Sequence, residues 1–347
     1  MGISSALGSS ALLPAGLGFR NLIINGGFDI NQRGFTSTTS NGDFGFDRWR
    51  LYAGNGTTTY SAQTFTPGNP ISGQEPKNFA RIVTTGQTLS SANSLLSQRV
   101  EGVRTAAGQT VVISFWAKSG SGTPSIAVEL SQVFGSGGSA TVNTVAGKVA
   151  ITTSWAKYQM STTLPSISGK TIGTNDNLNV QLWVSAGSDF NSETNSLGIQ
   201  SNTFDIWGVQ LEQNYQPTPF EQRPIGVELQ LCQRYYEKSY LPNTVPGSDA
   251  YAGCIQSSGA GNTDTTSYIG HPIRYVVTKR AIPTLTVYDR LGASGKVSRD
   301  NIAVSGSNGN TVSESDVYSS PNGAWIYSAS GIAADYIFFQ YVAVAEL

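Results

Sequence analysis

The sequence contains little charge, one histidine and two cysteines. Only 12% of its 347 residues are charged and the formal net charge is -1. Because nucleic-acid-binding proteins concentrate Lys and Arg on one surface, we expect no nucleic-acid partner. Cys232 and Cys254 are too few for a disulfide framework or a Cys-based zinc site. The single histidine, His271, is not accompanied by a metalloprotease, nucleophile-elbow or P-loop motif.

The sequence also lacks a long hydrophobic run. Its first twenty residues are small and mildly apolar, Pro14 and several glycines interrupt them, and no basic residue precedes Arg20. We therefore expect neither membrane insertion nor a secretory signal. Residues 1–20 are predicted to form an irregular arm, either docked on a partner or disordered.

Short strand-like runs, separated by turn residues, make up most of the chain. Eight such runs lie between residues 21 and 222, and Asn-Gly pairs at 25–26, 41–42 and 55–56 mark turns among them. This pattern predicts an all-β fold whose N-terminal part, residues 21–222, is a jelly-roll β-sandwich. Further runs predict a smaller C-terminal antiparallel β domain over residues 249–347.

A single helix is predicted between these two β domains. Pro217 and Pro219 exclude an ordered ladder, whereas Pro224 is compatible with a helix start. Apolar residues then recur at helical spacing as far as Tyr240, so residues 223–248 are predicted to be a short connecting helix and a linker. The residues expected to contact the neighbouring domain or another subunit are Ile225, Leu229, Cys232, Tyr235 and Tyr236.

Alternation within two strands places polar and aromatic side chains together on the face opposite the core. In VVISFWAK (111–118) and NLNVQLWV (177–184), alternate residues such as Val111, Ile113 and Phe115 are apolar and expected to face the core. Indole rings with amides and an amine suit a sugar, whose C–H face stacks on the ring and whose hydroxyls bind the polar groups. The alternative is that a loop or another subunit covers this face. The candidate glycan-binding residues are Trp116, Lys118, Asn179, Gln181 and Trp183.

Carboxylates that could cut a glycan are present, but no motif pairs them. Glycoside hydrolysis needs two carboxyl groups at a defined separation, which the sequence does not show. Solvation or turn capping is the ordinary role of such residues. The available acids are Asp43, Asp47, Glu129, Asp189 and Glu193.

Several segments carry a resemblance to a known group of proteins. They are RNLIINGGFDINQRGF (20–35), FGFDRWRLY (44–52), SFWAKSG (114–120) and IWGVQLEQNYQPTPFEQRPIGVELQLCQRYYEKS (206–239). Together they resemble tail-fibre-like and other virion-surface proteins of tailed bacteriophages, whose N-terminal domain is similar to carbohydrate-binding modules of jelly-roll fold.

The resemblance implies a non-enzymatic virion component, a tail or head fibre, that presents β domains to host cell-surface glycan. It further implies a homotrimer, attachment to other virion proteins through the N-terminal arm, and location in the virion after assembly in the host cytoplasm. Two alternatives remain, a polysaccharide depolymerase of the virion and a decoration or collar protein without a ligand.

The resemblance also raises the question of a structural calcium ion, although no other cofactor is expected. Sugar-binding jelly rolls often hold calcium near their first and last strands, where this chain has Asp29, Asp205 and Glu212. Such relatives often end the sandwich with an acidic pair, whereas Trp207 and Gly208 stand at the comparable position here. That departure argues against the ion.

Overall fold

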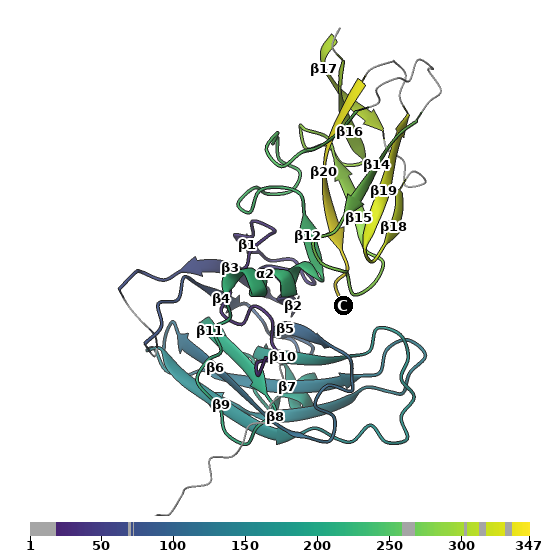
Figure 1. Cartoon of the computed structure of the whole chain (residues 1–347). Coiled ribbons are helices and arrows are strands. Elements are labelled where there is room, and N and C mark those ends of the chain that lie inside the picture. The colour runs from purple at the N-terminus through teal and green to yellow at the C-terminus, as the bar shows by residue number, and fades with distance from the viewer. Residues whose placement is uncertain are drawn as a thin grey trace, which may run out of the picture.

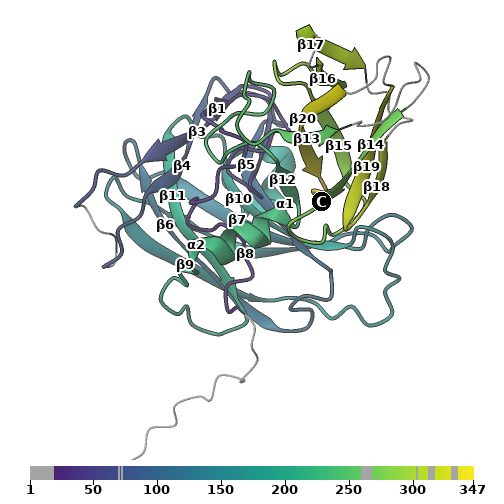
Figure 2. The ribbon, with the colours of Figure 1, turned by 45° about the horizontal axis from the view of Figure 1, so that its top comes forward.

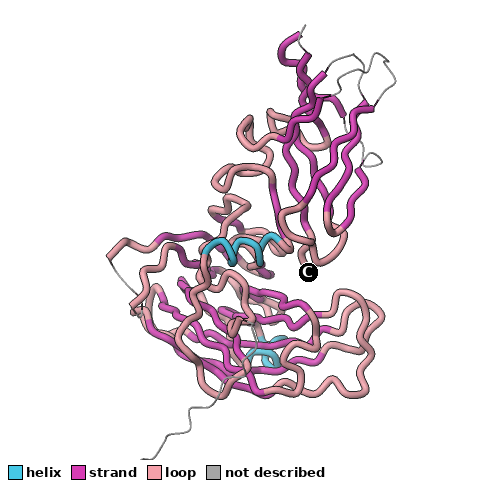
Figure 3. Tube along the Cα trace, viewed as in Figure 1, coloured by secondary structure: helices cyan, strands magenta, loops and turns pink. Residues whose placement is uncertain are grey.

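A computed structural model describes residues 19–68, 71, 73–258, 268–301, 304–311, 317–329 and 335–347. The predicted N-terminal arm, residues 1–20, lies outside the described residues except for Phe19 and Arg20. The fold is all-β, as predicted, with strands dominating the trace and helices confined to short segments (Figure 3).

The N-terminal domain is a sandwich of two antiparallel sheets, here called sheet A and sheet B. Sheet A has the order β1 (Ser37–Thr38), β3 (Thr57–Thr64), β4 (Asn78–Thr85), β11 (Thr203–Glu212), β6 (Thr110–Ser119) and β9 (Ala156–Thr163). Sheet B has the order β2 (Arg50–Gly54), β5 (Asn93–Glu101), β10 (Asn177–Ala186), β7 (Ser125–Val133) and β8 (Val142–Ala150). The chain crosses repeatedly between the sheets, which confirms the predicted jelly roll.

The inward faces of the two sheets form one apolar core. Phe115 from sheet A and Leu182 from sheet B are both fully buried in it, as the alternation predicts. Trp49 is also fully buried, and its indole N–H donates to the carbonyl of Asn25 at 2.9 Å. Trp49 is therefore a core residue, which leaves its neighbour Arg50 on the outer face.

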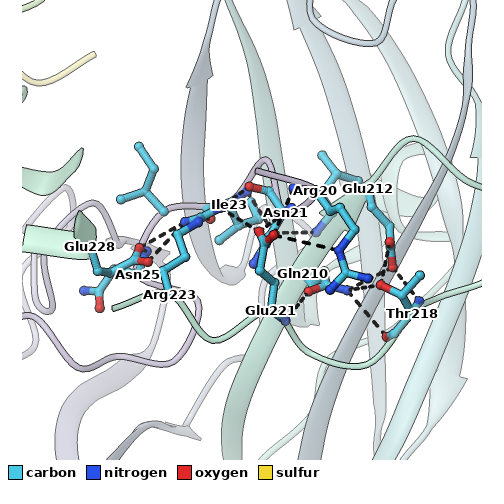
Figure 4. A network of polar contacts seen from close by, with 12 residues as sticks. Arg20, Asn21, Ile23, Asn25, Gln210, Glu212, Thr218, Glu221, Arg223 and Glu228 are labelled. Atoms are coloured by element: carbon cyan, nitrogen blue, oxygen red, sulfur yellow. Dashed lines mark hydrogen bonds and ion pairs between the residues drawn. The ribbon is translucent and has the colours of Figure 1, made fainter. Parts of the chain in front are cut away.

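A polar network attaches the segment after β11 to the start of the sandwich (Figure 4). The amides of Arg20 and Asn21 donate to Glu221 at 3.1 and 2.9 Å. Arg223 donates to the carbonyl of Ile23 at 3.1 Å and forms an ion pair with Glu228 at 3.2 Å. These contacts fix the direction in which the chain leaves the sandwich.

The connecting helix is shorter than predicted. Helix α2 spans Ile225–Gln233, and Pro224 caps it. The chain then enters strand β12 (Tyr236–Lys238), which pairs with Val342–Val344 of the last strand. The prediction that the helix continues to Tyr240 was wrong, because pairing with a distant strand overrides the local helical spacing of apolar residues.

The C-terminal domain contains two sheets. One has the order β12, β20 (Asp335–Val344), β16 (Lys296–Asn301) and β17 (Val304–Thr311), and β13 (Ile255–Ser258) and β15 (Thr284–Tyr288) also pair with β20. The other has the order β14 (Tyr268–Arg274), β19 (Gly323–Ala329) and β18 (Val317–Ser320). Buried Ile326 and Phe339 belong to one shared core.

The two domains meet around α2, β12 and the last residues of the chain (Figures 1 and 2). Glu346 accepts hydrogen bonds from Arg33, at 3.0 Å, and from Arg48. Arg234 binds Glu101 at the end of β5 at 2.8 Å. Charged groups therefore connect the domains.

Among the described residues, none of the helices has the length and hydrophobicity of a transmembrane span.

Candidate functional site

The five residues predicted to bind glycan do not form one surface. Trp116 and Lys118 lie on β6 in sheet A, whereas Asn179, Gln181 and Trp183 lie on β10 in sheet B. Alternation correctly placed all five on non-core faces, but the outer faces of a sandwich's two sheets point in opposite directions. The prediction of a single site was therefore wrong.

Trp183 is covered by a local segment of the chain. Only 4% of its surface is exposed, and it packs in a cluster with Leu95 and Leu197. The ring of Phe190, at the end of the short helix η1 (Ser188–Phe190), lies 5.2 Å from it, and helix α1 (Asn191–Thr194) follows. Trp183 is therefore not a sugar platform, and the alternative of a covering loop holds for it.

Trp116 belongs to an aromatic layer on the outer face of sheet A. It is partly buried opposite Trp207, whose ring lies 5.1 Å from that of Phe220. Its neighbour Lys118 is 3.6 Å from Asp205 and 5.6 Å from the ring centroid of Trp155. These side chains are engaged with loops of the same chain, so this layer offers few free polar groups.

The outer face of sheet B, by contrast, carries a continuous band of polar side chains, which we call the polar face and whose central members are buried. One row crosses four strands, from Arg50 through Ser97 and Gln181 to Glu129. The next row contains Arg99, Asn179 and Ser131. Tyr52 completes the polar face at one end, in the row of Trp183.

The centre of the polar face is held rigid by its own hydrogen bonds. Ser97 donates to Asn179 at 2.6 Å, and Gln181 donates to Glu129 and Ser131, both at 2.9 Å. Each of these groups is fixed by a neighbour on an adjacent strand. Such preorganisation lowers the entropy cost of binding a polar ligand.

Glu129 is a buried carboxyl on the polar face. The indole N–H of Trp183 donates to it at 3.0 Å, and only 2% of the residue is exposed. Burial raises the pKa of Glu129 to about 7, an increase that the hydrogen bond from Trp183 opposes and the nearby charge of Glu193 reinforces. Its charge is therefore partly neutralised near neutral pH.

Arg50, Tyr52 and Arg99 form the partly exposed end of the polar face. With Ser97, Phe44, Arg48 and Leu347 they line a small hollow of about 10 Å³. Sequence analysis did not select these three residues. The signal was present, because alternation around buried Leu51 assigns Arg50 and Tyr52 to the outer face.

The acids considered for calcium do not converge. Asp205 binds Arg81 through both oxygens, at 2.7 and 2.9 Å, and Glu212 accepts from Thr218 at 2.7 and 2.8 Å. Burial, reinforced by the charge of Glu228, raises the pKa of Asp29 to about 6. Among the described residues, no group of three His, Cys, Asp or Glu side chains is placed to hold a metal ion.

The residues predicted to make domain or subunit contacts have different surroundings. Ile225 is 62% exposed, so it does not pack against the neighbouring domain, and its contact with another subunit stays a prediction. Leu229 is partly exposed, and Cys232 is fully buried. Tyr235 and Tyr236 are both buried at the domain junction, where their rings lie 3.5 and 3.8 Å from the guanidinium carbons of Arg48 and Arg33, respectively.

Comparisons with known proteins give structural likenesses only. No protein-family model and no curated protein sequence matches the chain. The xylan-binding CBM22-2 domain of Paenibacillus barcinonensis Xyn10C is 19% identical at a TM-score of 0.30, covering 51% of this chain and 98% of that domain. A putative sugar-binding protein from Bacteroides thetaiotaomicron is 14% identical at 0.33, covering 56% and 100%.

A third likeness is to the enzymatically active domain of tailspike protein 4 from bacteriophage CBA120. It is 12% identical at a TM-score of 0.32, and the match covers 56% of this chain but only 22% of the tailspike chain. At these scores, the likenesses assign neither a ligand nor an activity to this chain.

Proposed function

We propose that the protein is a non-enzymatic glycan-binding protein and that the polar face of sheet B is its binding surface. The observation that supports this most directly is the row of polar side chains from Arg50 to Glu129 across four strands. Arg50, Ser97 and Gln181 carry hydrogen-bond donors and Glu129 carries acceptors, and Tyr52 lies in the adjacent row. A sugar presents the matching groups, hydroxyls around an apolar ring.

The proposed site is open at the β2 end and closed at the Trp183 end. Arg50, Tyr52, Arg99 and Gln181 are partly exposed, whereas Trp183 is buried under Phe190. A glycan would therefore lie over β2, β5 and β10. Arg99 would supply N–H donors, the amide oxygen of Gln181 would supply an acceptor, and the ring of Tyr52 would supply the apolar contact.

Substitution on the two faces of the sandwich tests this assignment. We expect Tyr52→Ala and Gln181→Ala each to reduce retention on host surface polysaccharide by about 10-fold, the equivalent of one lost hydrogen bond or stacking contact. Trp116→Ala and Lys118→Ala, on the opposite face, are expected to retain binding. Thermal unfolding of every variant controls for loss of fold. The reverse pattern, with loss only in the sheet A variants, would contradict the assignment.

We further propose that the protein is a tail or head fibre of a phage virion and acts as a homotrimer. The sequence segments that resemble virion-surface proteins support this, as does the presence of two β domains in one chain. Exposed Ile225 is available for a subunit contact. Imaging of labelled protein on particles tests the location, and a sedimentation mass equal to one 36.7-kDa chain would contradict the trimer.

A depolymerase is the second candidate, because a carboxyl of raised pKa lies on the polar face. Both oxygens of Glu129, however, accept hydrogen bonds from Ser131, Gln181 and Trp183, and the residue is 2% exposed. This arrangement favours a role in holding the sheet. Release of reducing ends from host polysaccharide, lost in Glu129→Gln, would instead support the enzyme.

A further inference from the structure

Two arginines on the polar face have no carboxylate partner among the described residues. Arg50 donates from Nε to the carbonyl of Gly42 at 2.6 Å, and Arg99 donates to the hydroxyl of Tyr52 at 3.1 Å. Other arginines of the chain do form ion pairs, namely Arg20, Arg33, Arg48, Arg81, Arg223 and Arg234. Arg50 and Arg99 therefore keep their positive charge and further N–H donors for a ligand.

Three acids of the neighbouring elements carry little free negative charge. Glu101 binds Arg234 at 2.8 Å, and Glu346 binds Arg33 and Arg48. Burial raises the pKa of Glu129 to about 7, which reduces its negative charge near neutral pH. The partly exposed end of the polar face is therefore cationic, although the whole chain has a formal net charge of -1.

Tyr52 links the two guanidinium groups. The guanidinium carbon of Arg50 lies 5.0 Å from the centroid of the Tyr52 ring, and the Tyr52 hydroxyl accepts from Arg99. Arg50 is opposite Ser97, so Arg99 is its diagonal neighbour on the next strand, a separation of about 7–8 Å between such positions. Both guanidinium groups thus contact the same tyrosine, Arg50 over its ring and Arg99 at its hydroxyl.

We propose that this end of the polar face selects acidic glycans, with Arg50 and Arg99 binding sugar carboxylates and Tyr52 packing against the sugar ring. Guanidinium matches carboxylate geometry through two parallel hydrogen bonds, and the aromatic ring matches the C–H face of the same residue. The inference rests on the proposed glycan-binding function and names the class of sugar.

A nucleic acid is the competing polyanion. Its phosphates are bound by many Lys and Arg side chains along a surface, whereas only two unpaired guanidinium groups lie on this end of the polar face, within the part of the chain that the structure describes. An isolated pair of guanidinium groups beside an aromatic ring suits a carboxylate attached to a sugar. Binding of nucleic acid is therefore measured as a separate outcome of the test.

Affinity electrophoresis with chemically paired polysaccharides tests the proposal. The probes are uronic-acid-containing bacterial capsular polysaccharides, each used before and after its carboxyl groups have been reduced to alcohols. We expect the intact polysaccharide to retard the protein, and the reduced form to bind at least about 10-fold more weakly, the effect of losing charge-assisted hydrogen bonds. Arg50→Gln and Arg99→Gln are each expected to bind the intact polysaccharide more weakly by a similar factor.

Two further variants test whether binding depends on the planar guanidinium group and on the face of the sandwich that carries the charge. Arg99→Lys keeps the charge but loses the planar fork, so it should bind between the native protein and Arg99→Gln. Lys118→Gln removes a cation from the opposite face, on sheet A, and should bind as the native protein does. Thermal unfolding establishes that each variant is folded.

The outcomes distinguish this inference from the function on which it rests. Equal binding of intact and reduced polysaccharide, with loss in Tyr52→Ala, overturns the acidic selectivity and leaves glycan binding in place. Binding of duplex DNA with the same arginine dependence also overturns it. Failure to bind either polysaccharide form overturns both proposals.

Discussion

Replacing Glu346 with glutamine is expected to lower the free energy of unfolding by about 3–5 kcal/mol, the typical effect of breaking a buried ion pair on one side. The Glu346 carboxylate is 6% exposed and contacts both Arg33 and Arg48. Arg48, which is 2% exposed, has no other carboxylate within ion-pair distance among the described residues. A neutral amide in place of this carboxylate would leave that guanidinium buried without a counter-charge.

Denaturant unfolding followed by tryptophan fluorescence measures this effect. Asp249→Asn, which neutralises an exposed carboxylate, is the matched control and should change stability by less than about 0.5 kcal/mol. A double-mutant cycle with Arg48→Met should give a coupling energy of about 1 kcal/mol or more. Equal stabilities of Glu346→Gln and Asp249→Asn would show that the domain junction does not depend on this pair.

Replacing Glu129 with glutamine is expected to stabilise the protein at alkaline pH by up to about 3 kcal/mol. The pKa of Glu129 is raised from 4.5 to about 7 by burial, so folding favours its protonated form. The native state therefore binds more protons than the unfolded state between these two values. The contribution of Glu129 to stability is full below about pH 4.5 and is lost as the pH rises through about 7.

The observable is the difference in unfolding free energy between Glu129→Gln and the native protein across pH 4–9. The introduced amide preserves an acceptor for Trp183 and Gln181, so the difference should grow as the pH rises and level off above about pH 7. Glu193→Gln should have a much smaller effect, because burial contributes more than Glu193 to the raised pKa. A difference that does not vary with pH would contradict the raised pKa.

Much of the fold was predictable because its main signals are local. Alternation identified the strands, and it placed Trp116 and Trp183 on non-core faces, as observed. It could not show that β6 and β10 belong to different sheets, because sheet membership depends on pairing between distant segments. The single predicted site failed for this reason.

The same limit applies to the end of the helix and to the site residues. The spacing of Tyr236 fits a helix, but its pairing with Val344 places it in a strand. Arg50 and Arg99 are unremarkable as isolated charges in a sequence. They become a candidate site only because β2 lies beside β5 and because the nearby carboxylates bind other arginines.

The central claim, that glycan binds the polar face of sheet B, is tested most directly by hydroxyl-radical footprinting of the protein with and without host polysaccharide. Aromatic side chains on the two faces serve as internal probes, Tyr52 on the polar face and Trp116 on the outer face of sheet A. We expect the glycan to protect Tyr52 and leave Trp116 unchanged. Protection of Trp116 with Tyr52 unchanged would contradict the claim.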